Sequence, residues 1–502
     1  MTWSDGEPMT AHDVAYTYNM ILDENFSAFT NYLPFVESIT APDDTTLVWK
    51  TTKPAVAPLL PPYIYILPEH IWGQLGGKDA IKAFKNFPDP VGSGPFKLVD
   101  WQKGESMTFE KVPNSFAGDP AIDTVIFQNF QNTETMTQAL RQGTIDFAES
   151  IPSELFDSLK DDPNITTNVG SGLSYVHFSF NQCFVQDYCR APGSVADPQP
   201  AVKDLRVRTA VAMAINKQEL VDRVLRGYGV PGTTMVGPSA AYWHWDPGDE
   251  TIPWDIPGAN QILDDAGYAD SDGDGVRNMP GGGENLVWKF VLPNDNKDRV
   301  RAAELISGWL KQIGITANPE VVSSAKMNDV WYANDYDVMS WGWGPDPDPD
   351  FILSAYTTDQ CGIWSDNCWS NEEYDKLYVK QQTARSPEER REIMYRMQEI
   401  FYEDVSQIIL WNDNDLQAYR SDRWEGFAFQ PKPDADGNGG SILYQSGLHS
   451  YLTIEPKAGA GTSTSSGGGV SAGIWIAILA GIAIVVVAVV MARRRRPDDD
   501  LE

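Results

Sequence analysis

Residues 286–292 read LVWKFVL, residues 299–313 read RVRAAELISGWLKQI, and residues 315–322 read ITANPEVV. The first and third segments are short apolar runs with β-branched residues, which is typical of strands, whereas the second has the length and apolar spacing of a helix. A helix between two such strands indicates a βαβ unit, in which the strands pair in parallel. This stretch therefore predicts an α/β fold with parallel strands.

Segments on both sides of this unit extend the same alternation. Residues 204–226 are predicted to form one long helix, because apolar residues recur on one face and Gly227 follows. Strands are expected at residues 175–181, 336–340 and 408–411, and further helices at residues 256–267, 371–384 and 386–404.

Residues 341–351 read WGWGPDPDPDF and combine two tryptophans with three aspartates. Closely spaced prolines are incompatible with a continuous helix or a central strand, so the whole segment is predicted to be a loop. Aromatic faces beside fixed carboxylates suit an organic ligand that has a cationic end. A proline-rich surface turn with two core tryptophans is the alternative interpretation.

The composition is that of a large, acidic globular protein. The chain has 502 residues, of which 42% are hydrophobic, and its net charge is −32. About three domains are expected at this length. A strongly negative field repels nucleic acid and anionic membrane surfaces, so we expect no nucleic-acid partner. Solubility in a salty medium would explain the same charge.

The cysteines form two local pairs, Cys183/Cys189 and Cys361/Cys368. Neither pair has the C-x-x-C spacing of a zinc site and no histidine lies close to either pair, so a metal is not expected. Two short disulfide-closed loops, Cys183–Cys189 and Cys361–Cys368, fit an oxidising compartment. Buried free thiols are the alternative.

The C-terminal segment has the pattern of a membrane anchor. Residues 458–473 are rich in Gly, Ser and Thr, which predicts a flexible linker. Residues 474–492 are almost wholly apolar and would span about 28 Å as a helix, enough to cross a bilayer. Arginines follow at once, so the positive-inside rule places residues 493–502 in the cytoplasm and residues 1–457 outside. We therefore expect a single-pass protein of the cell membrane.

The N-terminus does not match this topology. Export of a large N-terminal domain needs a signal, and residues 1–6 (MTWSDG) contain neither a basic nor an apolar segment. We therefore expect residues to be missing before Met1.

Several motifs, in order along the chain, resemble those of one known family. Residues 4–14 (SDGEPMTAHDV) resemble the SDG-x-P-x-T-A-x-D-V signature of the family 5 extracellular solute-binding proteins, the oligopeptide and dipeptide receptors of ABC importers. The resemblance covers about residues 1–455. Its other motifs are residues 91–96 (VGSGPF, similar to VGTGPY), residues 204–216 (DLRVRTAVAMAIN, similar to D-x-R-V-R-x-A-x-x-x-A-I-D) and residues 343–351 (similar to the W-x-x-D-x-x-D-P ligand loop).

This resemblance implies a two-lobe periplasmic-binding-protein-like fold of the class II type, whose α/β lobes close around a ligand at a hinge. Lobe I would comprise residues 1–173 and 431–457, and lobe II residues 174–430. Crossing strands near Ser174 and Pro431 would form the hinge. The family's first motif lies well inside lobe I, so the resemblance also implies that lobe I is incomplete at its N-terminus. The implied partners are the permease and ATPase subunits of an ABC transporter.

The resemblance also implies binding residues. In peptide-binding relatives an aspartate three positions after the loop tryptophan accepts the peptide's ammonium group, which corresponds to Asp346 here. Asp348 is a second candidate, because the spacing to the next Asp-Pro differs from that of relatives. The alternative role of Asp346 is to cap an Asp-Pro turn. No Arg or Lys lies between Lys326 and Trp343, so a partner for the peptide's carboxylate is in doubt.

Tryptophans are concentrated near the same loop, notably Trp331, Trp341 and Trp343. Some family 5 relatives bind oligosaccharides, and stacked indoles suit sugars. A membrane-anchored oligosaccharide receptor is therefore the alternative to a peptide receptor.

Two further functions were considered. Residues 270–275 (DSDGDG) resemble the start of a calcium loop, but Gly281 occupies the position of the bidentate Glu, which favours a solvated turn. No metalloprotease, nucleophile-elbow or dinucleotide-binding motif occurs, so we expect no cofactor and no enzyme. A secreted, tail-anchored hydrolase is a third possibility.

Overall fold

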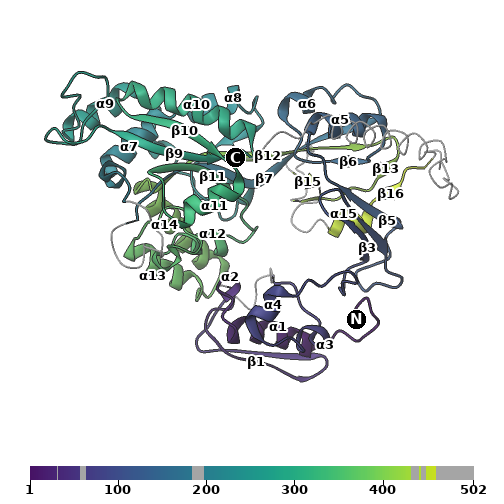
Figure 1. Ribbon diagram of the computed structural model, residues 1–502. Helices are drawn as coiled ribbons and strands as arrows, with labels where there is room; N and C mark the ends of the chain where they lie inside the picture. The colour runs from purple at the N-terminus through teal and green to yellow at the C-terminus, as the bar shows by residue number, and fades with distance from the viewer. Residues whose placement is uncertain (31, 57–63, 184–196, 431–439, 443–447, 459–502) are drawn as a thin grey trace, which may run out of the picture. The chain divides into compact units, whose positions relative to one another are not determined.

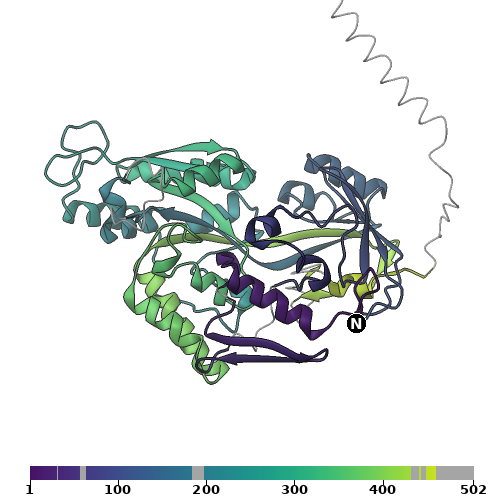
Figure 2. The ribbon, with the colours of Figure 1, turned by 60° about the horizontal axis from the view of Figure 1, so that its bottom comes forward.

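The computed structural model describes residues 1–458 except 31, 57–63, 184–196, 431–439 and 443–447. The chain divides into a compact unit, Met1–Pro456, and a second unit, Lys457–Glu502, which lies almost wholly outside the described residues. Figures 1 and 2 show the ribbon from two directions.

The largest sheet of the compact unit has seven strands in the order β10-β9-β11-β7-β12-β6, with β8 paired to β12. Strands β9, β10 and β11 are parallel where they pair, whereas β7 pairs antiparallel with both β11 and β12. The prediction of an α/β fold with parallel strands is confirmed. The strands are β6 (Phe147–Ala148), β7 (Ile165–Phe180), β8 (Gly229–Pro231), β9 (Val287–Pro293), β10 (Thr316–Val322), β11 (Val338–Trp343) and β12 (Gln407–Arg420).

Amphipathic helices pack against this sheet and form the main core (Figure 1). Val211, Phe290 and Leu310, from a helix, a strand and a second helix, are completely buried in it. Burying each such side chain contributes about 1.5–3 kcal/mol. The helices of this core are α7 (Leu205–Ala214), α8 (Lys217–Arg223), α9 (Ile256–Asp265) and α10 (Lys297–Gln312), whereas α11 (Ser324–Tyr332) packs on the sheet in a separate small cluster.

The predicted single helix over residues 204–226 is two helices. Helix α7 ends at Ala214, and Asn216 then accepts a hydrogen bond from the backbone N–H of Glu219 as the N-cap of α8. An asparagine side chain in this role stabilises a new helix start more than a continuation. The apolar pattern does not reveal the break, because both helices face the same core.

A second core lies beside residues 341–351 and is built from α12 (Asp350–Ser354), α13 (Glu372–Gln381) and α14 (Pro387–Glu403). Tyr175 of β7 and Ile409 of β12 are buried in this core. The two longest strands of the sheet therefore contribute side chains to it.

Residues 1–157 contribute to two smaller cores. One lies around α1, and the other is shared with Ile165 of β7 and with Leu416 and Ala418 of β12. Helix α1 starts with a capping box between Thr10 and Asp13 and lies along the β1–β2 hairpin (Figure 2). The elements here are α1 (Ala11–Asp23), α2 (Ser27–Thr30), β1 (Val36–Asp43), β2 (Thr46–Thr51), α3 (Glu69–Trp72), α4 (Gly77–Ala83), β3 (Phe96–Gln102), β4 (Ser106–Lys111), β5 (Thr124–Gln128), α5 (Thr133–Gln142) and α6 (Ser153–Asp157). After β12 follow β13 (Trp424–Glu425), β14 (Phe429–Gln430), β15 (Ser441–Ile442), α15 (Leu448–Thr453) and β16 (Glu455–Pro456).

Strands β7 and β12 pair along most of their length, and their register shifts between Ile409 and Trp411 and again between Asn412 and Asn414. Such irregularities bend a strand pair locally. Ser174, predicted to lie at a hinge, belongs to β7 close to these shifts. The second predicted hinge position, Pro431, lies outside the described residues.

In the part of the chain that the structure describes, no helix is both long and apolar enough to span a bilayer. The linker, membrane helix and cytoplasmic tail predicted from residue 458 onward fall on residues outside that part, apart from residue 458.

Candidate functional site

The tryptophans of residues 341–351 belong to a strand and not to a loop. Trp341 and Trp343 lie in β11, where they pair with His177 and Tyr175 of β7. The prediction of one continuous loop is wrong at both ends. At the first end the prolines begin only after Trp343, so the strand can continue to that residue. At the other end Pro349 immediately precedes α12, and a proline is tolerated at a helix start because no N–H is needed there. The loop proper comprises residues 344–349.

Asp348, one of the two predicted ammonium-binding residues, forms a buried ion pair with Arg390 of α14. The guanidinium donates to both carboxylate oxygens, at 2.5 Å and 2.8 Å. Its Nε donates to Gln381 (2.9 Å), and it lies 3.8 Å from Asp350. Arg390 is only 4% exposed. Asp348 therefore helps to hold the loop against α14, and Arg390 already occupies its carboxylate.

Asp350 starts α12 and is buried beside the same arginine. Its carboxylate accepts hydrogen bonds from Gln381 (2.5 Å) and Tyr378 (3.4 Å). Burial raises the pKa of Asp350 to about 6, and the positive charge of Arg390 limits the rise.

This pKa predicts a pH dependence of stability. A carboxyl group that binds its proton more tightly in the folded state than in the unfolded state stabilises the fold as the pH falls through the folded-state pKa. Lowering the pH from 7.5 to 5 should therefore add roughly 1–1.5 kcal/mol from Asp350. Asp350→Asn should lack this gain. Calorimetric unfolding of both proteins at the two pH values measures it, and a stability difference that does not change with pH would contradict the assignment.

Asp346, the first predicted ammonium-binding residue, lies in the middle of the loop and is partly buried. It accepts a hydrogen bond from the Tyr32 hydroxyl (3.4 Å). Burial raises its pKa, and the charge of Asp348 adds to the rise. Among the described residues no Lys, Arg or His forms an ion pair with Asp346 at 4 Å or less. Of the two predicted carboxylates, only Asp348 therefore has a cationic partner among the described residues.

A row of aromatic rings extends from this carboxylate. Tyr32 stacks on Phe351 (centroids 5.9 Å apart, planes 7° apart). Phe351 meets both Trp343 (6.0 Å) and Trp364 (5.4 Å) edge to face. The other predicted tryptophans form a separate pair, Trp331 and Trp341, at 6.0 Å. The structure thus groups Trp343 with Asp346 and leaves the Trp331–Trp341 pair outside the row.

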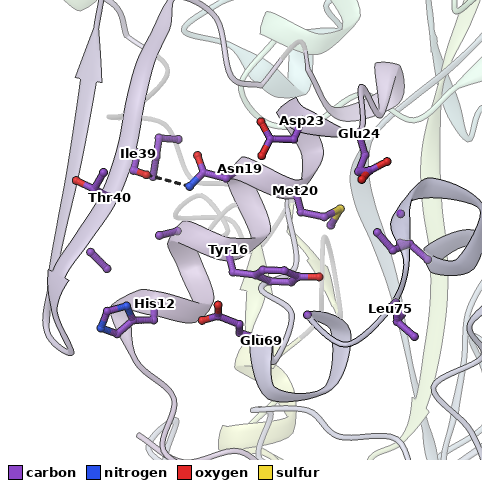
Figure 3. Close-up of a pocket in the computed structure, with 15 residues that line it drawn as sticks. His12, Tyr16, Asn19, Met20, Asp23, Glu24, Ile39, Thr40, Glu69 and Leu75 are labelled. Carbon is purple, nitrogen blue, oxygen red and sulfur yellow. Dashed lines mark hydrogen bonds between the residues drawn. The ribbon is translucent and has the colours of Figure 1, made fainter.

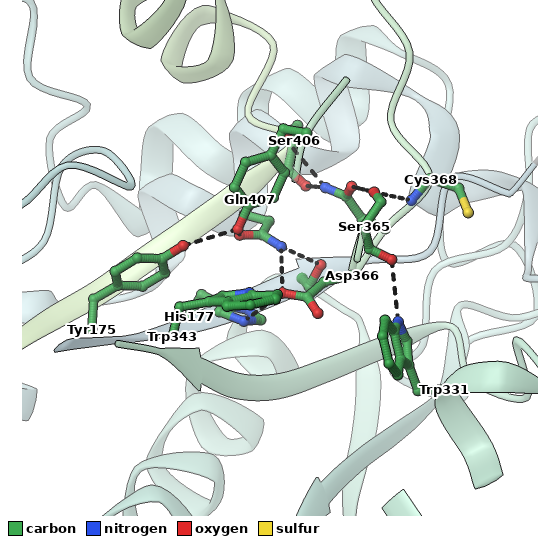
Figure 4. Close-up of polar contacts among 12 residues, drawn as sticks. Tyr175, His177, Trp331, Trp343, Ser365, Asp366, Cys368, Ser406 and Gln407 are labelled. Carbon is green, nitrogen blue, oxygen red and sulfur yellow. Dashed lines mark hydrogen bonds and ion pairs between the residues drawn. The ribbon is translucent and has the colours of Figure 1, made fainter. Parts of the chain in front are cut away.

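The far end of the row meets Asp366, a buried carboxylate that was not predicted. The indole Nε1 of Trp343 donates to Asp366 Oδ2. His177 Nε2 lies 3.1 Å from the same oxygen, and Gln407 Nε2 lies 3.5 Å from it (Figure 4). No local pattern announces this contact, because its partners are far apart in the sequence.

A cavity of about 590 Å³ is lined in part by two residues that are close to Tyr32 in the sequence. Thr30 and Pro34, which flank Tyr32, line one side of it, and the other side comes from residues 357–361 and 375–382. A second pocket, of about 500 Å³, is lined by residues of α1 and its neighbours, including His12, Tyr16 and Glu69 (Figure 3). Neither cavity is lined by Asp346 or by a ring of the aromatic row, and the first comes near the row in sequence only through Thr30 and Pro34.

The predicted Cys361–Cys368 disulfide is present. It closes the segment that carries Trp364 and Asp366. Cys183 is buried, with its sulfur within 4.8 Å of both bridged sulfurs. Its predicted partner, Cys189, lies outside the described residues, so that pairing stays a prediction.

The acidic turn at residues 270–275 brings three exposed carboxylates together. Those of Asp270, Asp272 and Asp274 lie within 4.8 Å of one another. Each accepts hydrogen bonds from backbone N–H groups of the same turn. These backbone contacts hold the three carboxylates in place within the turn.

Known proteins resemble this chain in both sequence and fold. Oligopeptide-binding protein AppA of Bacillus subtilis is 26% identical over 455 residues, covering 86% of this chain and 77% of AppA. The structure of AppA with a nonapeptide superposes with a TM-score of 0.74 at 23% identity, covering 91% of this chain and 85% of that one. A periplasmic oligopeptide-binding protein of Thermotoga maritima with bound mannohexaose gives a TM-score of 0.72 at 19% identity, covering 91% and 86%. At these identities the superpositions show the fold.

These superpositions show a two-lobe, periplasmic-binding-protein-like α/β fold. Residues 1–363 match the family described as bacterial extracellular solute-binding proteins, family 5 Middle. The chain belongs to this family, as its motifs led us to expect. The family consists of extracellular solute-binding proteins. A putative ABC transporter peptide-binding protein of Brucella ovis is 24% identical over 337 residues, covering 66% of this chain and 57% of that protein.

Proposed function

We propose that this chain captures oligopeptides outside the cytoplasm by their free amino terminus and delivers them to the permease and ATPase subunits of an ABC importer. Asp346 carries this proposal: it is a partly buried carboxylate that accepts a hydrogen bond from Tyr32, forms no ion pair among the described residues, and lies at the start of a row of aromatic rings. A buried carboxylate that faces an ammonium group gains a charge-assisted hydrogen bond. The relative AppA, whose structure holds a nonapeptide, supports the same ligand class.

We further propose that the lobes comprise residues 1–173 with 431–457 and residues 174–430, and that they close around the peptide. The register shifts in the β7–β12 pair near Ser174 support a hinge at this place. Residues 474–492 would anchor the receptor in the cell membrane, with the binding domain outside. Their uninterrupted apolar sequence, followed by arginines, supports this topology.

An oligosaccharide is the alternative ligand. The aromatic row favours it, since indole and phenyl faces also stack on sugar rings. The mannohexaose-bound protein of similar fold supports the same alternative.

The ligand class is tested by capture from mixtures. The purified protein is incubated with a tryptic digest of casein or with a mixture of mannose oligomers, and bound material is identified by mass spectrometry after washing. We expect intact peptides with free amino termini to be retained and acetylated digests to be retained poorly. Retention of sugar alone would support the alternative, and cleaved material would indicate an enzyme.

A further inference from the structure

Asp366 stands out among the buried groups because polar side chains from three strands converge on its carboxylate, two of them as hydrogen-bond donors. Asp366 is 3% exposed. Trp343 of β11 and Gln407 of β12 donate to its Oδ2, and Nε2 of His177 on β7 lies 3.1 Å from the same oxygen (Figure 4). A buried carboxylate without such partners would be strongly destabilising. This oxygen therefore ties the indole of Trp343 to both long strands.

The backbone around Asp366 is held as firmly as its side chain. The Tyr336 hydroxyl donates to the Asp366 carbonyl (2.5 Å), and the Cys361–Cys368 disulfide closes the segment. Burial, together with the charge of Asp366, raises the pKa of Tyr336 well above its usual value, so this phenol remains a donor. The acceptor for the Trp343 indole thus has a fixed position.

Trp343 itself is only partly buried, whereas Asp366, His177 and Gln407 are buried. Since its N–H is engaged by Asp366, the indole offers ring carbons to a neighbouring molecule and no hydrogen-bond donor. Phe351 connects the indole to Tyr32, whose hydroxyl contacts Asp346. The apolar surface of this row therefore begins beside the carboxylate proposed to bind the amino terminus.

We propose that Asp366 is a positioning residue for ligand recognition, which fixes the indole of Trp343 so that it takes an apolar or aromatic side chain next to the peptide's amino terminus. This inference rests on the proposed peptide-binding function. Asp366 does not touch the peptide and acts through Trp343. The Cys361–Cys368 segment that carries Asp366 thereby becomes part of the specificity of the receptor.

The test compares peptides that differ at one residue. The peptide most enriched from the casein digest is synthesised with either phenylalanine or asparagine at its second position, and both dissociation constants are measured by calorimetry. The original protein should prefer phenylalanine by about tenfold, in line with a well-placed aromatic contact. Asp366→Ala should reduce this preference to about twofold or less, whereas Asp366→Asn, which keeps an acceptor oxygen, should retain most of it.

A double-mutant cycle separates positioning from general damage. In a Trp343→Phe background the ring has no N–H, so adding Asp366→Ala should change the preference by less than about twofold. Asp337→Asn is the control, because Asp337 is a half-buried carboxylate that accepts hydrogen bonds from the backbone N–H groups of Gln199 and Lys289 and makes no contact with the Trp343 indole nitrogen. This control should keep the preference unchanged.

Each outcome decides the question. The positioning role would be overturned if Asp366→Ala kept the phenylalanine preference. It would also be overturned if Asp366→Ala reduced that preference equally in the original protein and in the Trp343→Phe background. Neither result would contradict the proposed peptide-binding function. If Asp366→Ala does not fold, the Trp343→Phe protein is measured instead, and an unchanged preference there would overturn the role. If the original protein retains no peptide from the digest, the proposed function itself fails, and the inference fails with it.

Discussion

Replacing Arg390 with methionine should lower the free energy of unfolding by about 3–5 kcal/mol. The guanidinium is almost wholly buried and donates to both carboxylate oxygens of Asp348, at 2.5 Å and 2.8 Å. A carboxylate oxygen of Asp350 lies 3.8 Å from the same guanidinium. Methionine fills much of the same space and removes the charge, so two buried carboxylates would lose the cation that pairs with them. Breaking one side of a buried ion pair costs far more than the pair itself contributes.

The same helix offers a matched control. Arg396 also forms ion pairs, with Glu373, Glu399 and Glu403, but its side chain is 39% exposed. Solvent-exposed pairs contribute about 1 kcal/mol or less, so Arg396→Met should have a small effect. Chemical denaturation of both variants measures the difference. Equal destabilisation by the two substitutions would show that the buried pair does not hold the loop against α14.

The sequence predicts those parts of the fold that local patterns encode. The βαβ unit of β9, α10 and β10 follows from apolar periodicity within one continuous stretch, and α14 follows from a Ser-Pro start and a regular apolar face. The break before α8 was missed, because a single asparagine cap outweighs a pattern that continues through it.

The candidate site could be predicted only where it coincides with a motif. Asp346 and Trp343 lie in the loop that resembles the family's ligand loop, and the structure keeps them in one region. Asp366 has no such signal, since His177 is 189 positions before it and Gln407 is 41 positions after it. Arg390 is likewise 42 positions beyond Asp348. Contacts of this range are set by packing of the whole sheet against α12–α14 and leave no local pattern.

The carboxylate of Asp346 should decide whether a free amino terminus is recognised. Asp346→Asn keeps the shape of the side chain and removes its charge. If a peptide ammonium group pairs with Asp346, the substitution leaves that ammonium desolvated and unpaired, at a cost on the order of 2–5 kcal/mol. Affinity should then fall by roughly thirtyfold or more. Acidification should weaken peptide binding too, because burial raises the pKa of Asp346 and the group loses its charge at a higher pH than an ordinary aspartate.

Two further ligands, an acetylated peptide and a neutral oligosaccharide, test this prediction. Acetylating the peptide's amine should weaken binding to the original protein about as much as Asp346→Asn does, and should weaken binding to the Asn variant much less. A neutral oligosaccharide has no ammonium, so Asp346→Asn should cost it only about 1 kcal/mol for a lost hydrogen bond. For such a ligand Trp343→Ala should be the more damaging change, because the indole would supply the stacking surface. Calorimetry with one ligand of each type distinguishes the two. If Asp346→Asn bound a free-amine peptide with full affinity, Asp346 would not be the residue that pairs with the ammonium group. A partly buried ammonium group that loses its charged partner binds more weakly.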